Sequence, residues 1–222
     1  MKKLFSFQKR DTTNRLPKIL ERGTQVFVPL CPDYIPGGIA DGVSALMLSA
    51  LEAVKEVQYK YSQTSFMFLI ADTECDILEG FDRRPIEASR DKLACELGRF
   101  GILSQTRLFS ESFSDWHTLQ YEMEKKIQEV LASTPDLDYF LSLYQEKRRE
   151  RYSIQYGQGR RLSTEEVRAL QIRHYAQYLV LLDIMHEQGR LVLMNYQTEN
   201  LRALTKQHPF LPERRRLELI VY

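Results

Sequence analysis

Two short apolar segments with a helical pattern between them constrain the fold of this chain most strongly. The first, at 25–30, reads Gln-Val-Phe-Val-Pro-Leu, and the second, at 65–71, reads Ser-Phe-Met-Phe-Leu-Ile-Ala. Short apolar runs bounded by turn residues are typical of buried strands in a parallel sheet. Residues 42–57 between them have the spacing of a helix. The sequence therefore predicts a β-α-β unit whose two strands are parallel neighbours.

The same alternation of strands and helices continues along the chain. Ser163 and Glu166 have the spacing of a capping box and predict the start of a helix. Further strands are expected at 105–110, 191–196 and 217–222, and further helices at 87–100, 116–131, 136–151, 163–189 and 200–206. We predict an α/β fold: a single Rossmann-like domain with a mostly parallel sheet flanked by helices and a helical region at about 115–188. The domain is expected at 23–222, after an N-terminal arm at 1–22.

The composition favours a soluble, cytoplasmic protein. Apolar residues make up 43% of the 222 residues, and the net charge is +1. No apolar run reaches the roughly 18 residues that a membrane-spanning helix needs. The three cysteines form no CxxC pair, which favours free thiols in a reducing compartment.

Several cofactor and metal signatures are missing from the sequence. It contains no GxxxxGK[ST] phosphate loop, no GxGxxG fingerprint and no GxSxG elbow. Its four histidines have no close metal-ligand spacing. We therefore predict neither a cofactor nor a metal.

Polar residues follow both strands of the predicted unit. Cys31, Asp33 and Tyr34 follow the first strand. Sites of open parallel sheets lie beyond the carboxyl ends of the strands, so these residues are candidates for chemistry. Cys31 is either a nucleophilic thiol or a small buried apolar side chain. Asp33 and Tyr34 are candidate substrate-binding residues.

Three carboxylates, Asp72, Glu74 and Asp76, alternate after the second strand. In an extended segment they would face one way and repel one another unless a cation lay between them. That cation would be magnesium or the side chain of a basic substrate, arginine before lysine. Alternatively, Asp72 caps the next turn and the other two are solvated.

A basic segment at 147–161 carries six Lys and Arg residues but only one acid, Glu150. It also contains Tyr152 and Tyr156. Guanidinium groups bind phosphates and aromatic rings stack on bases, so the segment is a candidate RNA-binding surface. A solvated helix face is the alternative. The candidate RNA-binding residues are Arg148, Arg149, Arg160 and Arg161.

Tyr178 and Asp183 lie on the predicted helix after Ser163. A carboxylate among so many apolar neighbours is costly if buried unpaired, so Asp183 needs a partner or a function. Tyr178 is either a core ring or a site residue.

This layout, from about residue 24 to 200, resembles the tRNA-dependent cyclodipeptide synthases, which share the fold of the catalytic domain of class I aminoacyl-tRNA synthetases. In that family a first strand ends in a nucleophilic serine and a second ends in Asp-Thr. A basic helix follows, and later a helix bearing YxxxE precedes a strand that ends in tyrosine. The corresponding residues here are Cys31, Asp72-Thr73, the basic residues Arg90 and Lys92, Tyr178, and Tyr196. Cys31 replaces the serine, unless Ser44 or another hydroxyl is the nucleophile. Leu182 stands where the glutamate is expected, with Asp183 one position further.

The resemblance implies an aminoacyltransferase that binds aminoacyl-tRNA and forms an amide bond between small-molecule amino-acid substrates. Cys31 would accept the aminoacyl group, Tyr178 and Asp183 would hold the substrate ammonium and relay protons, and Tyr196 would orient the ester. Arg90 and Lys92 would hold the tRNA together with the arginines of the 147–161 segment.

Two alternatives belong to other functional classes. One is a small-molecule transferase or ligase on the same fold that uses a nucleotide and magnesium bound by the three carboxylates. The other is a non-catalytic RNA-binding protein that uses the basic segment.

Overall fold

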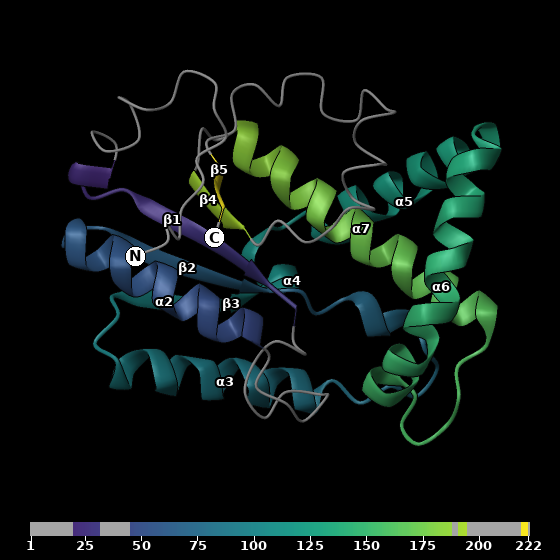
Figure 1. Cartoon of the computed structure of the whole chain (residues 1–222), viewed down its shortest axis with the longest axis horizontal. Helices are drawn as coiled ribbons and strands as arrows, with labels where there is room; N and C mark the ends of the chain where they lie inside the picture. Colours follow the sequence, from purple (N-terminus) through teal and green to yellow (C-terminus); the bar gives the residue numbers. More distant parts are fainter. Residues whose placement is uncertain (1–19, 32–44, 188–190, 195–218, 222) are drawn as a thin grey trace.

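Among the described residues, a five-stranded, fully parallel sheet forms the centre of the molecule (Figure 1). The computed structural model describes residues 20–31, 45–187, 191–194 and 219–221. The strand order is β3-β2-β1-β4-β5. The strands are β1 (Gln25–Leu30), β2 (Ser65–Ile70), β3 (Ser104–Leu108), β4 (Leu191–Met194) and β5 (Leu219–Val221). The α/β, Rossmann-like class predicted from the sequence is confirmed.

The β1–β2 pair is the predicted β-α-β unit. The strands are parallel and in register from Gln25 opposite Ser65 to Leu30 opposite Ile70. Helix α2 (Ala45–Lys60) connects them. The strand order reverses beside β1, since the chain moves outward to β2 and β3 and then returns to place β4 on the other side of β1. Such a switch point is where folds of this class bind their ligands.

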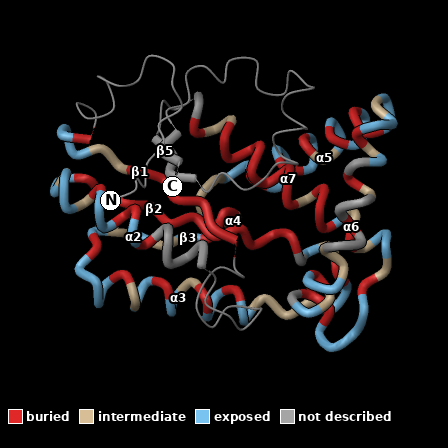
Figure 2. Tube along the Cα trace, viewed as in Figure 1, coloured by how far each residue is buried: buried red, intermediate tan, exposed pale blue. Residues whose placement is uncertain are grey.

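The two faces of the sheet belong to two separate hydrophobic cores. Alternate residues of a strand point to opposite faces, so Val26 and Val28 enter one core while Phe27, between them, enters the other. Helices α2 and α3 (Arg84–Arg99) supply the first core. Helices α5 (Trp116–Ser133) and α7 (Thr164–Glu187) supply most of the second (Figure 2).

Helices α6 (Pro135–Tyr156) and α7 pass from one core to the other. Leu137 near the start of α6 lies in the second core, and Tyr156 at its end lies in the first. Helix α7 runs in the reverse sense: Leu170 belongs to the first core and Tyr175 to the second. Their contact region therefore borders both cores.

Several predicted boundaries differ from the observed ones. Helix α6 extends to Tyr156, beyond the expected end near residue 151, because Tyr152 and Tyr156 are buried against the first core. Strand β3 ends at Leu108, and the short helix α4 (Phe109–Ser112) follows it. The predicted capping box is confirmed, since the Glu166 amide donates to Ser163 Oγ (3.1 Å) and the Ser163 amide to Glu166 Oε2 (2.7 Å).

Two other predictions are not tested by the structure. The predicted helix at 200–206 lies outside the described residues. The division into an arm at 1–22 and one domain at 23–222 stays a prediction. In the described part of the chain, no helix is both long enough and apolar enough to cross a membrane.

Candidate active site

Cys31 directly follows β1, the strand at which the sheet order reverses. It is buried, with 5% of its surface exposed. Strand β1 is central and apolar, which holds this end of the strand firmly against β2: the Ala71 amide donates to the Leu30 carbonyl at 2.9 Å. The structure therefore places Cys31 where the sequence predicts it, at the carboxyl end of β1.

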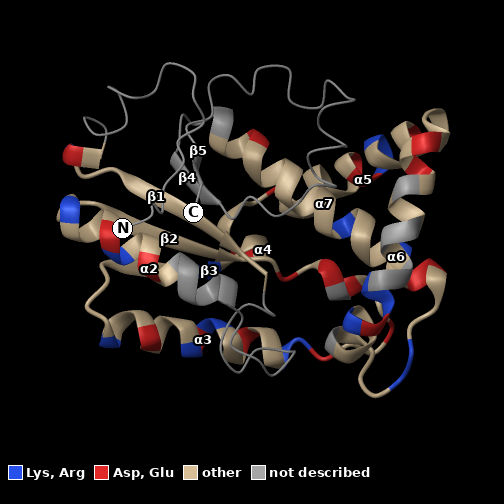
Figure 3. Ribbon diagram, in the orientation of Figure 1, with Lys and Arg blue, Asp and Glu red and all other residues tan. Residues whose placement is uncertain are grey.

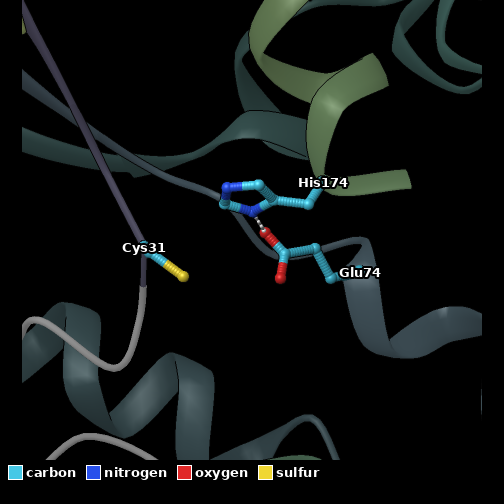
Figure 4. A group of neighbouring side chains, drawn as sticks. All are labelled: Cys31, Glu74 and His174. Atoms are coloured by element: carbon cyan, nitrogen blue, oxygen red, sulfur yellow. Dashed lines mark hydrogen bonds and ion pairs between the residues drawn. The ribbon is translucent and has the colours of Figure 1, made fainter. Parts of the chain in front are cut away.

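A chain of polar contacts leads from Cys31 through Tyr156 and Glu74 to His174. Figure 4 shows three of these residues, Cys31, Glu74 and His174. The Cys31 Sγ lies 3.9 Å from the Tyr156 hydroxyl. That hydroxyl donates to Glu74 Oε2 at 2.8 Å. The other carboxylate oxygen, Oε1, lies 2.5 Å from His174 Nδ1. We call these four residues the thiol cluster.

Four different elements build the thiol cluster. Cys31 follows β1, and Glu74 begins the 3₁₀ helix η2 (Glu74–Ile77) after β2. Tyr156 is the last residue of α6, and His174 lies on α7. All four are buried. A buried carboxylate is costly without partners, and Glu74 has one partner on each oxygen.

Tyr178 borders this cluster and Asp183 does not. Tyr178 is one turn beyond His174 on α7, and the two rings lie 4.9 Å apart. Its ring also meets Phe109 edge-on at 5.9 Å. Asp183 is half-buried and follows His174 by nine residues, which is about 14 Å along a helix axis. The proposed role of Asp183 stays a prediction.

Asp72 is separated from the thiol cluster by its own partners. Its Oδ1 accepts the Ser110 amide (3.1 Å), and its Oδ2 accepts the Ser110 hydroxyl and the Arg83 guanidinium. Burial raises the pKa of Asp72 above its ordinary value, although Ser110 and Arg83 both oppose this rise.

The prediction that Asp72, Glu74 and Asp76 face one way is wrong. It assumed an extended segment, but the chain turns into the 3₁₀ helix at Glu74. Asp76 is exposed and lies 3.7 Å from Arg83, the same arginine that holds Asp72. Arg83 therefore supplies a cation to Asp72 and Asp76, but not to Glu74.

A buried polar network fixes the loop between β2 and η2. The Thr73 amide donates to Gln177 Oε1 at 3.4 Å, and the Thr73 hydroxyl donates to Gln120 Oε1 at 2.5 Å. The Trp116 indole also donates to Gln120 Oε1, at 3.0 Å. Because α5 and α7 hold Thr73 in this way, the adjacent Glu74 is directed toward Cys31.

The basic segment is more strongly paired than its sequence indicates. Arg160 forms a two-pronged ion pair with Glu166 (2.6 and 2.9 Å), an acid beyond the end of the segment. Arg149 donates to the Leu162 carbonyl at 2.9 Å, and Arg148 lies 3.5 Å from the Tyr152 hydroxyl. The prediction that this stretch lacks balancing acids is therefore wrong for Arg160, while Arg161 is exposed.

The two basic candidates on α3 are also at the surface. Arg90 contacts Asp91 at 2.9 Å and Glu111 at 3.1 Å, whereas Lys92 is exposed. The ribbon in Figure 3, coloured by residue type, shows basic and acidic residues interspersed along α3 and around the connection from α6 to α7. RNA binding by either group stays a prediction.

Cys31, Glu74 and His174 are residue types that can bind zinc, and one ligand atom from each lies within 4.8 Å of the others. However, Glu74 Oε1 and His174 Nδ1 are 2.5 Å apart. Two tetrahedral ligands at about 2.0–2.1 Å from zinc would be roughly 3.3 Å apart. The observed geometry fits a hydrogen bond, and we assign no metal here; the predicted absence of a metal stays a prediction.

Sequence reasoning finds part of this site. Cys31, Glu74 and Tyr178 are predicted site residues, and the structure brings them together. The sequence indicates Tyr156 only as a base-stacking ring, and His174 is missed. No sequence signal separates His174 from the other polar residues of this helix, such as Arg173 and Gln177. The predicted site residues Asp33, Tyr34 and Tyr196 lie outside the described residues.

Two solved cyclodipeptide synthase (CDPS) structures share this fold over nearly the whole chain. The CDPS from Fluoribacter dumoffii aligns with a TM-score of 0.56 and 11% identity, covering 98% of this chain and 96% of that one. The CDPS from Staphylococcus haemolyticus aligns with a TM-score of 0.55 and 13% identity, covering 98% and 97%. The predicted distant resemblance to this family is confirmed, and at this identity it establishes the fold.

Comparisons at the level of sequence are negative. No protein-family model matches the chain. No curated protein matches it significantly.

Proposed function

We propose that this chain is an aminoacyltransferase of the cyclodipeptide synthase type, which takes aminoacyl groups from aminoacyl-tRNA and joins them through amide bonds. The observation that carries the proposal is the thiol of Cys31 at the switch point of a CDPS-like fold, beside the acid–base groups of Glu74, Tyr156 and His174. A covalent intermediate on a thiol divides a difficult transfer into two easier steps.

In the first step Cys31 attacks the ester carbonyl of one aminoacyl-tRNA. The Sγ–C bond forms, the C–O bond to the ribose breaks, and the thiol proton ends on the released ribose hydroxyl. In the second step the amine of another aminoacyl-tRNA attacks the thioester, which forms the amide and restores the thiol. The free amine of the dipeptidyl-tRNA then displaces the second tRNA and closes the ring.

Tyr178 is proposed to hold the ammonium of the bound aminoacyl group. Its ring packs against His174, so it borders the thiol cluster, and it is buried. Tyr196 is proposed to orient the ester, and Asp33 and Tyr34 to contact the substrate. Basic residues at the surface are proposed to hold the tRNA backbone.

The proposal also includes a substrate with a basic side chain, such as arginine. Glu74 is then the carboxylate that would bind this side chain. The inference began from three carboxylates that need a cation, and Arg83 satisfies Asp72 and Asp76. Glu74 is the member of the three that lies near Cys31. The identity of the products decides which amino acids the enzyme uses.

The test is mass spectrometry of extracts from cells that express the protein. We expect new cyclic dipeptides, and we expect them to disappear with Cys31→Ala. Purified protein incubated with mixed aminoacyl-tRNA should gain an aminoacyl mass on Cys31. Cys95→Ser is the matched control, because Cys95 is an exposed thiol on α3. Product formation that survives Cys31→Ala would reject the proposed acceptor, and the absence of any cyclic dipeptide or adduct would reject the function.

A further inference from the structure

The donor and acceptor of each hydrogen bond in the thiol cluster can be assigned. A tyrosine hydroxyl has one hydrogen, and a carboxylate only accepts. The Tyr156 hydroxyl therefore donates its hydrogen to Glu74 Oε2, 2.8 Å away. Its oxygen can accept the thiol hydrogen of Cys31, whose sulfur lies 3.9 Å from it. The hydrogen-bonded path thus runs from Cys31 through Tyr156 to Glu74.

His174 completes the path at its far end. Its Nδ1 faces Glu74 Oε1 at 2.5 Å, so Nδ1 carries the hydrogen of this bond. This contact occupies one carboxylate oxygen and leaves the other to Tyr156. His174 thereby fixes the orientation of Glu74.

Charge also favours one resting state. A carboxylate oxygen of Glu74 lies within 4.8 Å of Cys31 Sγ, and both groups are buried. A thiolate and a carboxylate this close would repel strongly in a medium of low dielectric. A neutral thiol beside an ionised Glu74 avoids that repulsion. If the proton moves to Glu74 as the thiol attacks, the pair never carries two negative charges.

We infer that Tyr156 and Glu74 form a proton relay for Cys31, in which Glu74 is the proton acceptor and His174 is the positioning residue. The inference rests on the proposed function. As the Sγ–C bond forms, the thiol proton moves to the Tyr156 oxygen and the hydroxyl proton moves to Glu74 Oε2. When the C–O bond breaks, the proton returns through Tyr156 to the departing ribose oxygen, and Glu74 is ionised again.

Other groups around Glu74 belong to the same electrostatic environment. Tyr152 on α6 is buried, and burial raises its pKa, with the charge of Glu74 adding to the rise. The Arg148 guanidinium lies beside the Tyr152 hydroxyl and opposes that rise. Tyr178 on α7 packs against His174. Tyr152 is not a member of the relay, so it offers a control one turn from Tyr156.

The test uses two readouts that need no tRNA. The first is the thiol pKa of Cys31, measured from the thiolate absorbance at about 240 nm as pH is varied. For each variant, the absorbance of the same protein carrying Cys31→Ala is subtracted, so that only the Cys31 signal remains. The second is the rate at which 4-nitrophenyl acetate acylates Cys31, followed by release of nitrophenolate. Glu74→Gln should lower the thiol pKa, because a repelling charge is removed. It should nevertheless slow acylation by about 100-fold or more, because the proton acceptor is lost.

Tyr156→Phe should slow acylation to a similar degree, and Tyr152→Phe should not. If Glu74→Gln raises the thiol pKa instead, Glu74 supports a thiolate–imidazolium pair with His174 and the relay is wrong. Unchanged acylation in Tyr156→Phe would also overturn it. Normal acetate transfer without any aminoacyl transfer would reject the proposed function and leave the relay in place.

Discussion

Asp72 is a buried carboxylate held between Ser110 and Arg83. Burial raises its pKa above the ordinary value of 3.8, so the folded protein binds this proton more tightly than the unfolded chain does. The contribution of Asp72 to stability is therefore fully present below about pH 3.8 and is lost as pH rises through the raised pKa. The neutral amide of asparagine cannot show this dependence.

We expect Asp72→Asn to change how stability depends on pH. Relative to the unchanged protein, the variant should become more stable as pH rises from about 4 toward neutrality, so the difference in free energy of unfolding (variant minus unchanged) should increase. Urea unfolding at a series of pH values measures this difference. Asp91→Asn, which makes the same replacement at an exposed carboxylate on α3, is the control. A difference that does not vary with pH would contradict the raised pKa.

Single residues also mark the limit of prediction from sequence. Cys31 could be placed because an apolar strand ends next to it, and the position after a strand is a local property. The Tyr156–Glu74 and His174–Glu74 contacts join residues 82 and 100 positions apart. No local pattern specifies such a pairing, so Tyr156 and His174 could not be assigned to the site.

At the scale of elements, hydrophobic periodicity predicted correctly whether each described segment that it identified is a helix or a strand. The path of the chain between these elements depends on hydrogen bonds that periodicity does not reveal. The alternation of Asp72, Glu74 and Asp76 fits a strand, yet Thr73 is held by Gln177 and Gln120 and the chain turns into a 3₁₀ helix. These tertiary hydrogen bonds override the local pattern. This one turn explains why the prediction that the three carboxylates face one way is wrong.

The end of α6 depends on a glycine with no room for a side chain. A Cβ atom added to Gly157 would lie 2.2 Å from the Arg160 carbonyl oxygen and 2.3 Å from that of Ser153. Both are backbone atoms, so the turn that places Tyr156 would have to move. We expect Gly157→Ala to destabilise the protein by about 2 kcal/mol or more and to weaken Cys31 reactivity.

Gly98→Ala is the matched control for this substitution. Gly98 lies in α3, and nothing stands within 4 Å of its added Cβ. Alanine in a helix is favoured over glycine by about 0.5–1 kcal/mol, so this variant should be slightly stabilised. Thermal and urea unfolding of both variants measure the contrast. A Gly157→Ala protein as stable as Gly98→Ala would show that the turn can rearrange freely.

At the scale of the whole molecule, the predicted RNA-binding surface depends on how the basic residues are distributed, because the net charge is only +1. Arg160 and Arg161 lie on the connection between α6 and α7, and Arg161 is exposed. If they contact phosphates, replacing both by glutamine should weaken tRNA binding. It should also reduce the slope of log affinity against log salt by about 0.7–0.9 for each phosphate that is no longer neutralised.

Binding measured between about 50 and 200 mM salt gives this slope. Replacing Lys125 and Lys126 by glutamine removes the same charge from the exposed side of α5 and is the control. Equal slopes for the two double variants would mean that the α6–α7 connection is ordinary solvated surface. Because Arg160 is paired with Glu166, we expect Arg161 to contribute more than Arg160 to any RNA binding.

The long separation between Cys31 and its partners has a consequence for how the protein is made. The thiol and Tyr156 are 125 residues apart in the chain. Closing so long a loop is entropically costly, and such contacts form late in folding. A chain that has left the ribosome only as far as α5 carries the thiol without Tyr156 or His174. If the proposed relay is right, the thiol of a nascent or truncated chain is not activated until α7 has been synthesised and packed.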